Sequence, residues 1–84
     1  MKKLFNTKSS EKLNSKLISL MGQNLSVTYE TAEFIRDSGM YTGNKFRNMQ
    51  MWATEYEFSL NGNKYTLYWP DNGLILILQG SCFN

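Results

Sequence analysis

Two glutamates, Glu55 and Glu57, come closest to a chemical motif in this chain. Alternation along a predicted strand places both side chains on one face, and a pair of carboxylates can bind a cation or transfer protons. The same face also carries Ser59, Lys64 and Thr66, which is typical of a polar sheet face in contact with water. We therefore expect the pair to be solvated and not catalytic.

The composition argues against the other common routes to catalysis. The chain has no histidine, the side chain that most often transfers protons at neutral pH, so its one cysteine, Cys82, has no histidine to activate it. One thiol can form neither an internal disulfide nor a tetrahedral zinc site. No glycine-rich phosphate loop and no serine nucleophile motif occurs in the sequence. We expect a protein that is not an enzyme and holds neither a metal nor a cofactor.

The N-terminal part of the chain is basic. Residues 1–24 hold five lysines and one acid, and Lys8, Lys12 and Lys16 are spaced to form a stripe along a helix. This stripe, together with Arg47, could contact phosphates, so a weak nucleic-acid-binding module is one hypothesis. Phosphate binding usually leaves a larger basic excess than the net charge of +2 in this chain, which favours a solvated helix face instead.

The segment from residue 40 to residue 52 combines methionines, aromatic rings, an arginine and a glycine. This composition is enriched where proteins bind one another. The competing interpretation is that these side chains cover an open face of the protein's own sheet. We predict that Arg47→Glu combined with Met49→Ala abolishes partner binding and leaves the fold intact. The candidate protein-binding residues are Tyr41, Lys45, Phe46, Arg47, Met49 and Met51.

The first half of the chain predicts a helix and a strand, followed by a less regular stretch. Apolar residues recur at helical spacing over residues 10–21, and the alternation over residues 25–29 predicts a short strand. Residues 31–39 are expected to form a helix capped by Thr31, with a second strand as the alternative. Residues 40–50 have no clear period, so an irregular segment is expected there.

A β-hairpin is the sharpest structural prediction. Residues 52–60 alternate with Trp52 on the apolar face, and Asn61-Gly62 then favours a two-residue turn because both turn positions need a positive φ. This turn pairs Leu60 with Asn63 and moves most of the aromatic rings to one buried face. The other pairs expected on that face are Phe58 with Tyr65, Tyr56 with Leu67, and Thr54 with Trp69.

A second turn at residues 70–73 leads to the strand Leu74–Leu78, which has no polar side chain. Such a strand needs a central place in a sheet, so we expect it between the strands at residues 65–69 and 25–29. The predicted fold is α+β: one small domain over residues 1–84. Its N-terminal helix packs on an antiparallel sheet of about four strands, which ends in a three-stranded β-meander.

We expect a small cytoplasmic protein that acts by binding another macromolecule. The N-terminus lacks the apolar core of a signal peptide, and the longest apolar run, Leu74–Leu78, is too short to span a membrane. Small lysine- and asparagine-rich chains of this kind look like accessory proteins of phages or other mobile elements, many of which inhibit a host enzyme by covering its surface. This likeness implies a protein partner in the host cytoplasm, such as a host enzyme or a defence complex. Nucleic acid is the alternative partner. A homodimer formed through the second face of the Leu74–Leu78 strand or through an open sheet edge is a third hypothesis.

Overall fold

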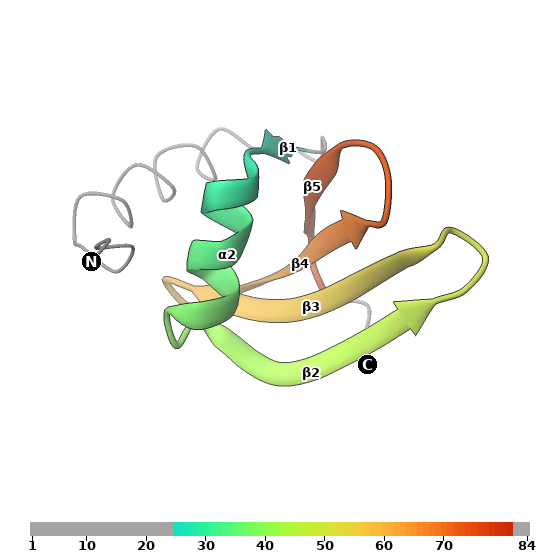
Figure 1. The fold of residues 1–84 in the computed structure, drawn as a ribbon. Coiled ribbons are helices and arrows are strands. Elements are labelled where there is room, and N and C mark those ends of the chain that lie inside the picture. Colours follow the sequence, from blue (N-terminus) through green and yellow to red (C-terminus); the bar gives the residue numbers. More distant parts are fainter. Residues whose placement is uncertain (1–24, 82–84) are drawn as a thin grey trace.

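The structure, a computed structural model, describes residues 25–81 as one helix and a five-stranded antiparallel sheet (Figure 1). The strand order across the sheet is β1-β5-β4-β3-β2. The architecture is α+β, with five strands where about four were expected. The predicted helix at residues 10–21, the lysine stripe and Cys82 lie outside the described residues. The elements are β1 (Leu25–Val27), α2 (Tyr29–Asp37), β2 (Tyr41–Asn48), β3 (Ala53–Leu60), β4 (Asn63–Pro70) and β5 (Ile75–Gln79).

The β3–β4 hairpin confirms the predicted register. Leu60 pairs with Asn63, and the ladder continues without a shift to the pair of Ala53 and Pro70. Asn61 and Gly62 have φ values of 54° and 81°, so both turn positions have the positive φ of a type I′ turn. Local turn chemistry and side-chain alternation therefore agree on one pairing.

The helix predicted over residues 31–39 exists, but it begins earlier. Thr28, not Thr31, is the N-cap: its backbone is extended, and its hydroxyl oxygen accepts a hydrogen bond from the Thr31 N–H at 3.2 Å. Tyr29 consequently belongs to the helix and not to the strand expected at residues 25–29. The helix ends at Asp37, shortly before Gly39.

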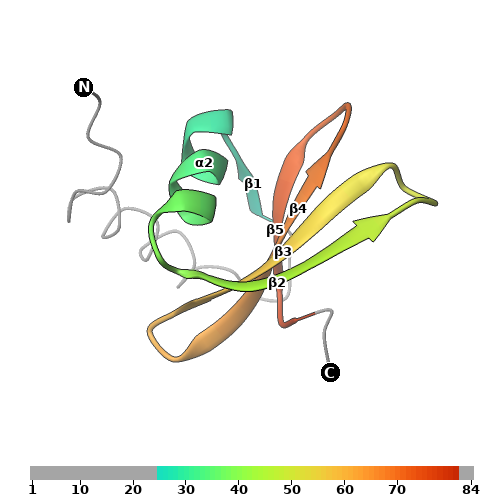
Figure 2. The ribbon, with the colours of Figure 1, turned by 60° about the horizontal axis from the view of Figure 1, so that its bottom comes forward.

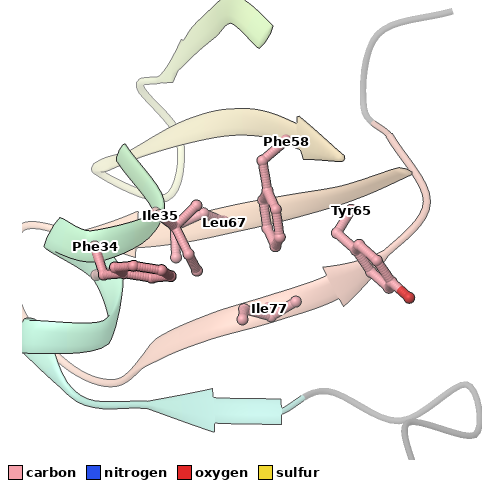
Figure 3. Close-up of a cluster of buried hydrophobic side chains, with 7 residues drawn as sticks. Phe34, Ile35, Phe58, Tyr65, Leu67 and Ile77 are labelled. Atoms are coloured by element: carbon pink, nitrogen blue, oxygen red, sulfur yellow. The ribbon is translucent and has the colours of Figure 1, made fainter. Parts of the chain in front are cut away.

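The core lies between α2 and one face of the sheet, with α2 across that face in Figure 2. Ala32, Phe34 and Ile35 of α2 meet apolar side chains from the three inner strands (Figure 3). These sheet residues are Phe58, Tyr65, Leu67 and Ile77, and all are buried. The Phe58 and Tyr65 rings stack with centroids 5.4 Å apart, which confirms that the predicted apolar face of the hairpin is core.

Strand β5 takes the central position expected for the chain's longest apolar run. It pairs with β4 on one side and with β1 on the other, so its backbone is hydrogen-bonded along both edges. Ile77 is fully buried on the face that α2 covers, whereas Leu76 and Leu78 on the other face are half-buried. Among residues 25–81 no helix is long and apolar enough to cross a membrane.

The prediction of an irregular segment at residues 40–50 is wrong for most of that range, because Tyr41–Asn48 form strand β2. All six residues between its two ends are exposed, so burial imposes no alternation on their sequence. A register shift between Tyr41 and Lys45 removes the remaining period, and Gly43 lies in this bulge with a φ of 95°. The strand forms because its backbone pairs with β3, a partner that local sequence does not reveal.

Candidate functional site

Exposed apolar side chains gather where β2 turns into β3. Of the six large hydrophobic residues that are exposed among residues 25–81, four lie at positions 46 to 52, with exposed fractions of 48% for Phe46, 60% for Met49, 57% for Met51 and 59% for Trp52. A fifth, Leu74, is 70% exposed in the β4–β5 turn at the same end of the sheet (Figure 1). Grouped exposure of this kind marks interaction surfaces, whereas scattered single residues do not.

The β2–β3 turn, residues 49–52, is tied down at both ends. The Met51 N–H donates to the side-chain oxygen of Asn48 at 3.1 Å, and the amide of Asn48 donates in turn to Glu55 at 3.0 Å. The carbonyl of Trp52 accepts a hydrogen bond of 2.8 Å from the N–H of Asp71, at the end of β4. The exposed side chains therefore stand on a backbone that the neighbouring elements hold.

Arg47 reinforces this arrangement through its side chain. Its two terminal nitrogens donate to the two carboxylate oxygens of Asp71 at 2.9 and 2.7 Å, and one of them also donates to Thr54 at 3.2 Å. These contacts hold the pKa of Asp71 below its ordinary value. A glutamate at position 47 would stand beside Asp71 with the same charge, so the combined Arg47→Glu and Met49→Ala variant disturbs the turn as well as its surface. A clean test leaves Arg47 in place.

Trp52 ends the predicted binding segment but is not among the predicted protein-binding residues. Alternation put it in a strand with its ring in the core, but β3 begins only at Ala53 and Trp52 belongs to the turn. Its φ is 53°, a left-handed conformation that is unusual for a bulky residue and costs about 1–2 kcal/mol. No local signal in the sequence marks a tryptophan for this backbone. Strain of this kind gathers at functional sites.

Apart from Lys45, which is exposed on β2, the remaining predicted protein-binding residues divide into two groups. Phe46, Met49 and Met51 lie with Trp52 at the end of β2. Tyr41 lies at the opposite end of the strand, where its half-buried ring packs edge-on against Tyr56 with centroids 5.4 Å apart. The structure thus leaves the end of the segment exposed and gives Tyr41 a packing role, which is the competing interpretation.

The carboxylates of β3 are not solvated, which corrects the sequence-based expectation. Glu55 and Glu57 are only 8% and 2% exposed. The β2 bulge covers Glu57: the Thr42 hydroxyl donates to its carboxylate at 3.1 Å, and the Asn44 side-chain amide donates to the same oxygen. The Lys64 ammonium lies 3.5 Å from the other oxygen. The polar face of β3 is buried because an adjacent strand supplies donors for its charges.

These donors decide what Glu57 can do chemically. Hydrogen bonds from Asn44, Ser81 and Thr42, with the charge of Lys64, lower the pKa of Glu57 to about 2. A carboxylate with this pKa stays ionised at neutral pH and is a weak base, so it suits a structural role better than proton transfer. Within residues 25–81 no group of three or more acidic or thiol side chains is placed to hold a metal ion.

The nucleic-acid hypothesis gains no site from the described part of the chain. Lys8, Lys12 and Lys16 lie outside residues 25–81, and Arg47 is already paired with Asp71. No family model, curated protein or solved structure matches the chain.

Proposed function

We propose that this protein is a non-enzymatic binding protein that covers a surface of a partner protein with its β2–β3 turn and Phe46. The observation that carries the proposal is the gathering of Phe46, Met49, Met51 and Trp52, all about half exposed or more, in one seven-residue stretch. Methionine adapts to irregular surfaces, and tryptophan is enriched among the residues that dominate binding energies. Hydrophobic side chains of this size are otherwise expected to be buried in so small a domain.

The way the turn is held also favours binding. The hydrogen bond from the Met51 N–H to the Asn48 side-chain oxygen and the one from the Asp71 N–H to the Trp52 carbonyl fix the backbone before a partner arrives. A preorganised surface loses less conformational entropy on association, which leaves more of the contact energy for affinity. The left-handed Trp52 fits the same interpretation, because its conformation displays the ring at a cost in stability.

The biological role that suits such a protein is an inhibitor or accessory factor of phage or mobile-element type, acting in the cytoplasm of the host cell. This part of the proposal rests on analogy, since small compact proteins without catalytic residues commonly act by occluding the surface of a larger enzyme or defence complex. A hydrophobic turn on a rigid sheet is suited to that action, because it can fill a pocket of the larger protein.

The test compares affinity capture from an extract of the native host cell by the wild type and by two variants. One variant combines Met49→Ser with Met51→Ser; the other is Trp52→Asn, because asparagine tolerates the left-handed backbone of this position. We expect both to lose a protein that the wild type retains. The matched control is Asn63→Ser, an exposed change at the start of β4, next to the β3–β4 turn, which should retain it.

Two results would count against this function. Undiminished capture by both variants removes the turn as the binding surface. Capture of nucleic acid alone, lost between low and moderate salt, would favour the lysine-based alternative, because phosphate contacts weaken steeply with salt and apolar contacts do not.

A further inference from the structure

Strand β2 forms one edge of the sheet (Figure 2). In the part of the chain that the structure describes, it pairs with β3 and with no other strand. The register shift between Tyr41 and Lys45 interrupts the edge, so its regular part runs from Lys45 to Asn48. An exposed edge of this kind can accept an additional strand through its backbone groups.

The hydrogen-bonding pattern of the neighbouring hairpin tells which backbone groups of this edge point outward. In a type I′ turn the flanking residues Leu60 and Asn63 exchange backbone hydrogen bonds, and such pairs recur at every second residue of the ladder. Glu55 is therefore one of the residues whose N–H and C=O point toward β2, where Phe46 lies opposite. The Ser59 N–H, which donates to the Met40 carbonyl at 3.1 Å, follows the same alternation.

Phe46 and Asn48 therefore direct their backbone groups inward to β3, and Lys45 and Arg47 direct theirs to the free edge. Directly opposed residues share a face, so the side chains of Lys45 and Arg47 lie on the face of Tyr56 and Thr54. Phe46 lies on the other face. The edge offers two hydrogen-bonding positions, both basic, with an exposed aromatic ring between them.

A second copy of this chain does not suit the edge. An antiparallel self-pairing that uses the outward backbone groups places Lys45 opposite itself, Arg47 opposite itself, or Lys45 opposite Arg47. Like charges directly opposite each other destabilise a strand pair, and lysine on an edge is a common protection against unwanted pairing. Asp71 already neutralises Arg47, whereas Lys45 has no ion-pair partner among residues 25–81.

We infer that the Lys45–Asn48 edge of β2 binds an extended segment of the partner protein, with an acidic side chain opposite Lys45 and an apolar side chain opposite Phe46. The inference rests on the proposed function and names its binding mode. The added strand forms backbone hydrogen bonds with Lys45 and Arg47, and its charge complements the basic edge. The added strand runs to the β2–β3 turn, where Met49, Met51 and Trp52 contact the adjoining surface of the partner.

The probe for this inference is a short fluorescent peptide that alternates glutamate with valine, measured by fluorescence anisotropy against the full chain. We expect it to bind, and a peptide that alternates lysine with valine not to bind. Methylation of the glutamate amides removes the donors that face Lys45 and Arg47 and should weaken binding at least about tenfold. Methylation of the valine amides, which point away from β2, is the matched control and should change little.

A protein variant gives an independent check. Lys45→Pro removes an outward N–H, and proline is tolerated on a sheet edge where no ladder hydrogen bond is lost. Lys45→Pro should weaken binding of the glutamate–valine peptide at least about tenfold more than Lys45→Gln does, because Lys45→Gln removes only the charge.

Two results would overturn strand addition. The first is that methylation of the glutamate amides and methylation of the valine amides weaken peptide binding equally. The second is that Lys45→Pro and Lys45→Gln bind the glutamate–valine peptide with equal affinity. Loss of partner capture by Trp52→Asn under either result would leave the proposed function standing without this binding mode. Unchanged capture by Trp52→Asn and by the methionine variant would remove the proposed function itself.

Discussion

At the scale of single residues, Glu57 shows how a charged side chain becomes part of the interior. Asn44 and Thr42 donate to its carboxylate from the β2 bulge, and Lys64 approaches from β4. A buried carboxylate without such donors would be strongly destabilising. The same contacts link the bulge to β3, so Glu57 helps to determine the position of the edge strand.

The lowered pKa of Glu57 predicts a specific pH dependence of stability. Because the folded-state pKa of about 2 lies below the ordinary value of 4.5, Glu57 contributes stability above pH 4.5 and loses it as the pH falls toward 2. The melting temperature of Glu57→Gln should lack the pH dependence that Glu57 contributes, so it approaches the melting temperature of the wild type at low pH.

The Asn44 side-chain amide is the donor that lowers the Glu57 pKa most. Asn44→Ala removes this donor, so a carbon-detected NMR titration of the variant should show a higher Glu57 pKa. An unchanged titration would contradict the role given to Asn44.

At the scale of elements, β2 owes its shape to the bulge between Tyr41 and Lys45. Gly43 has a φ of 95° there, and a Cβ atom added at this position would meet no atom of a non-neighbouring residue within 4 Å. The requirement for glycine is therefore one of backbone conformation and not of space. The bulge brings Thr42 and Asn44 to Glu57 and limits the regular edge to its last four residues.

We accordingly expect Gly43→Ala to lower the free energy of unfolding by about 1–2 kcal/mol, measured by urea denaturation. Gly43→Asn should cost less, since asparagine adopts left-handed conformations more readily. In the alanine variant, the amides of β2 should lose protection from hydrogen exchange at a smaller destabilisation than the amides of β4 and β5, which lie inside the sheet. Equal stability of the alanine variant and the wild type would show that the bulge does not need this conformation.

At the scale of the whole molecule, the sheet combines a buried centre with an edge strand, β2, that pairs only with β3 among the described residues. Strand β5 lies inside the sheet, while β2 forms the rim with exposed residues on both faces. An edge of this kind is a risk for uncontrolled association unless its charges oppose it. Lys45, which has no ion-pair partner among residues 25–81, opposes pairing with other copies of the chain, and in the binding mode that we propose its charge attracts an acidic side chain.

From the charge at position 45 we expect the wild type to be a monomer and Lys45→Glu to self-associate. In the pairing that sets position 45 of one copy opposite Arg47 of the other, the substitution replaces two repulsive contacts by two attractive ones. Sedimentation equilibrium should show an average mass that rises with concentration for this variant. The combination of Asn63→Asp with Asn72→Asp lowers the net charge by the same two units and should stay monomeric. If the control associated to the same extent, the lower net charge alone would explain the association of Lys45→Glu.

The sequence by itself determined the centre of the fold. Side-chain alternation and the Asn61-Gly62 turn gave the complete β3–β4 register, and the apolar run of β5 gave its central position. The sequence also favours helix α2, although it indicates Thr31 as the N-cap where the structure has Thr28. These features could be predicted because burial on one face, or on two, leaves a period in the sequence.

Only the tertiary structure decided the edge and the candidate site. Strand β2 is exposed on both faces, so it carries no period, and its hydrogen bonds come from residues of β3 that are distant in sequence. Glu57 looked solvated because its neighbours on β3 and β4 are polar, yet Thr42 and Asn44 bury it from another strand. Trp52 fitted the alternation of β3 but lies in a turn that Asn48 and Asp71 hold. In each case the deciding contact joins separate elements, and local sequence patterns do not record such contacts.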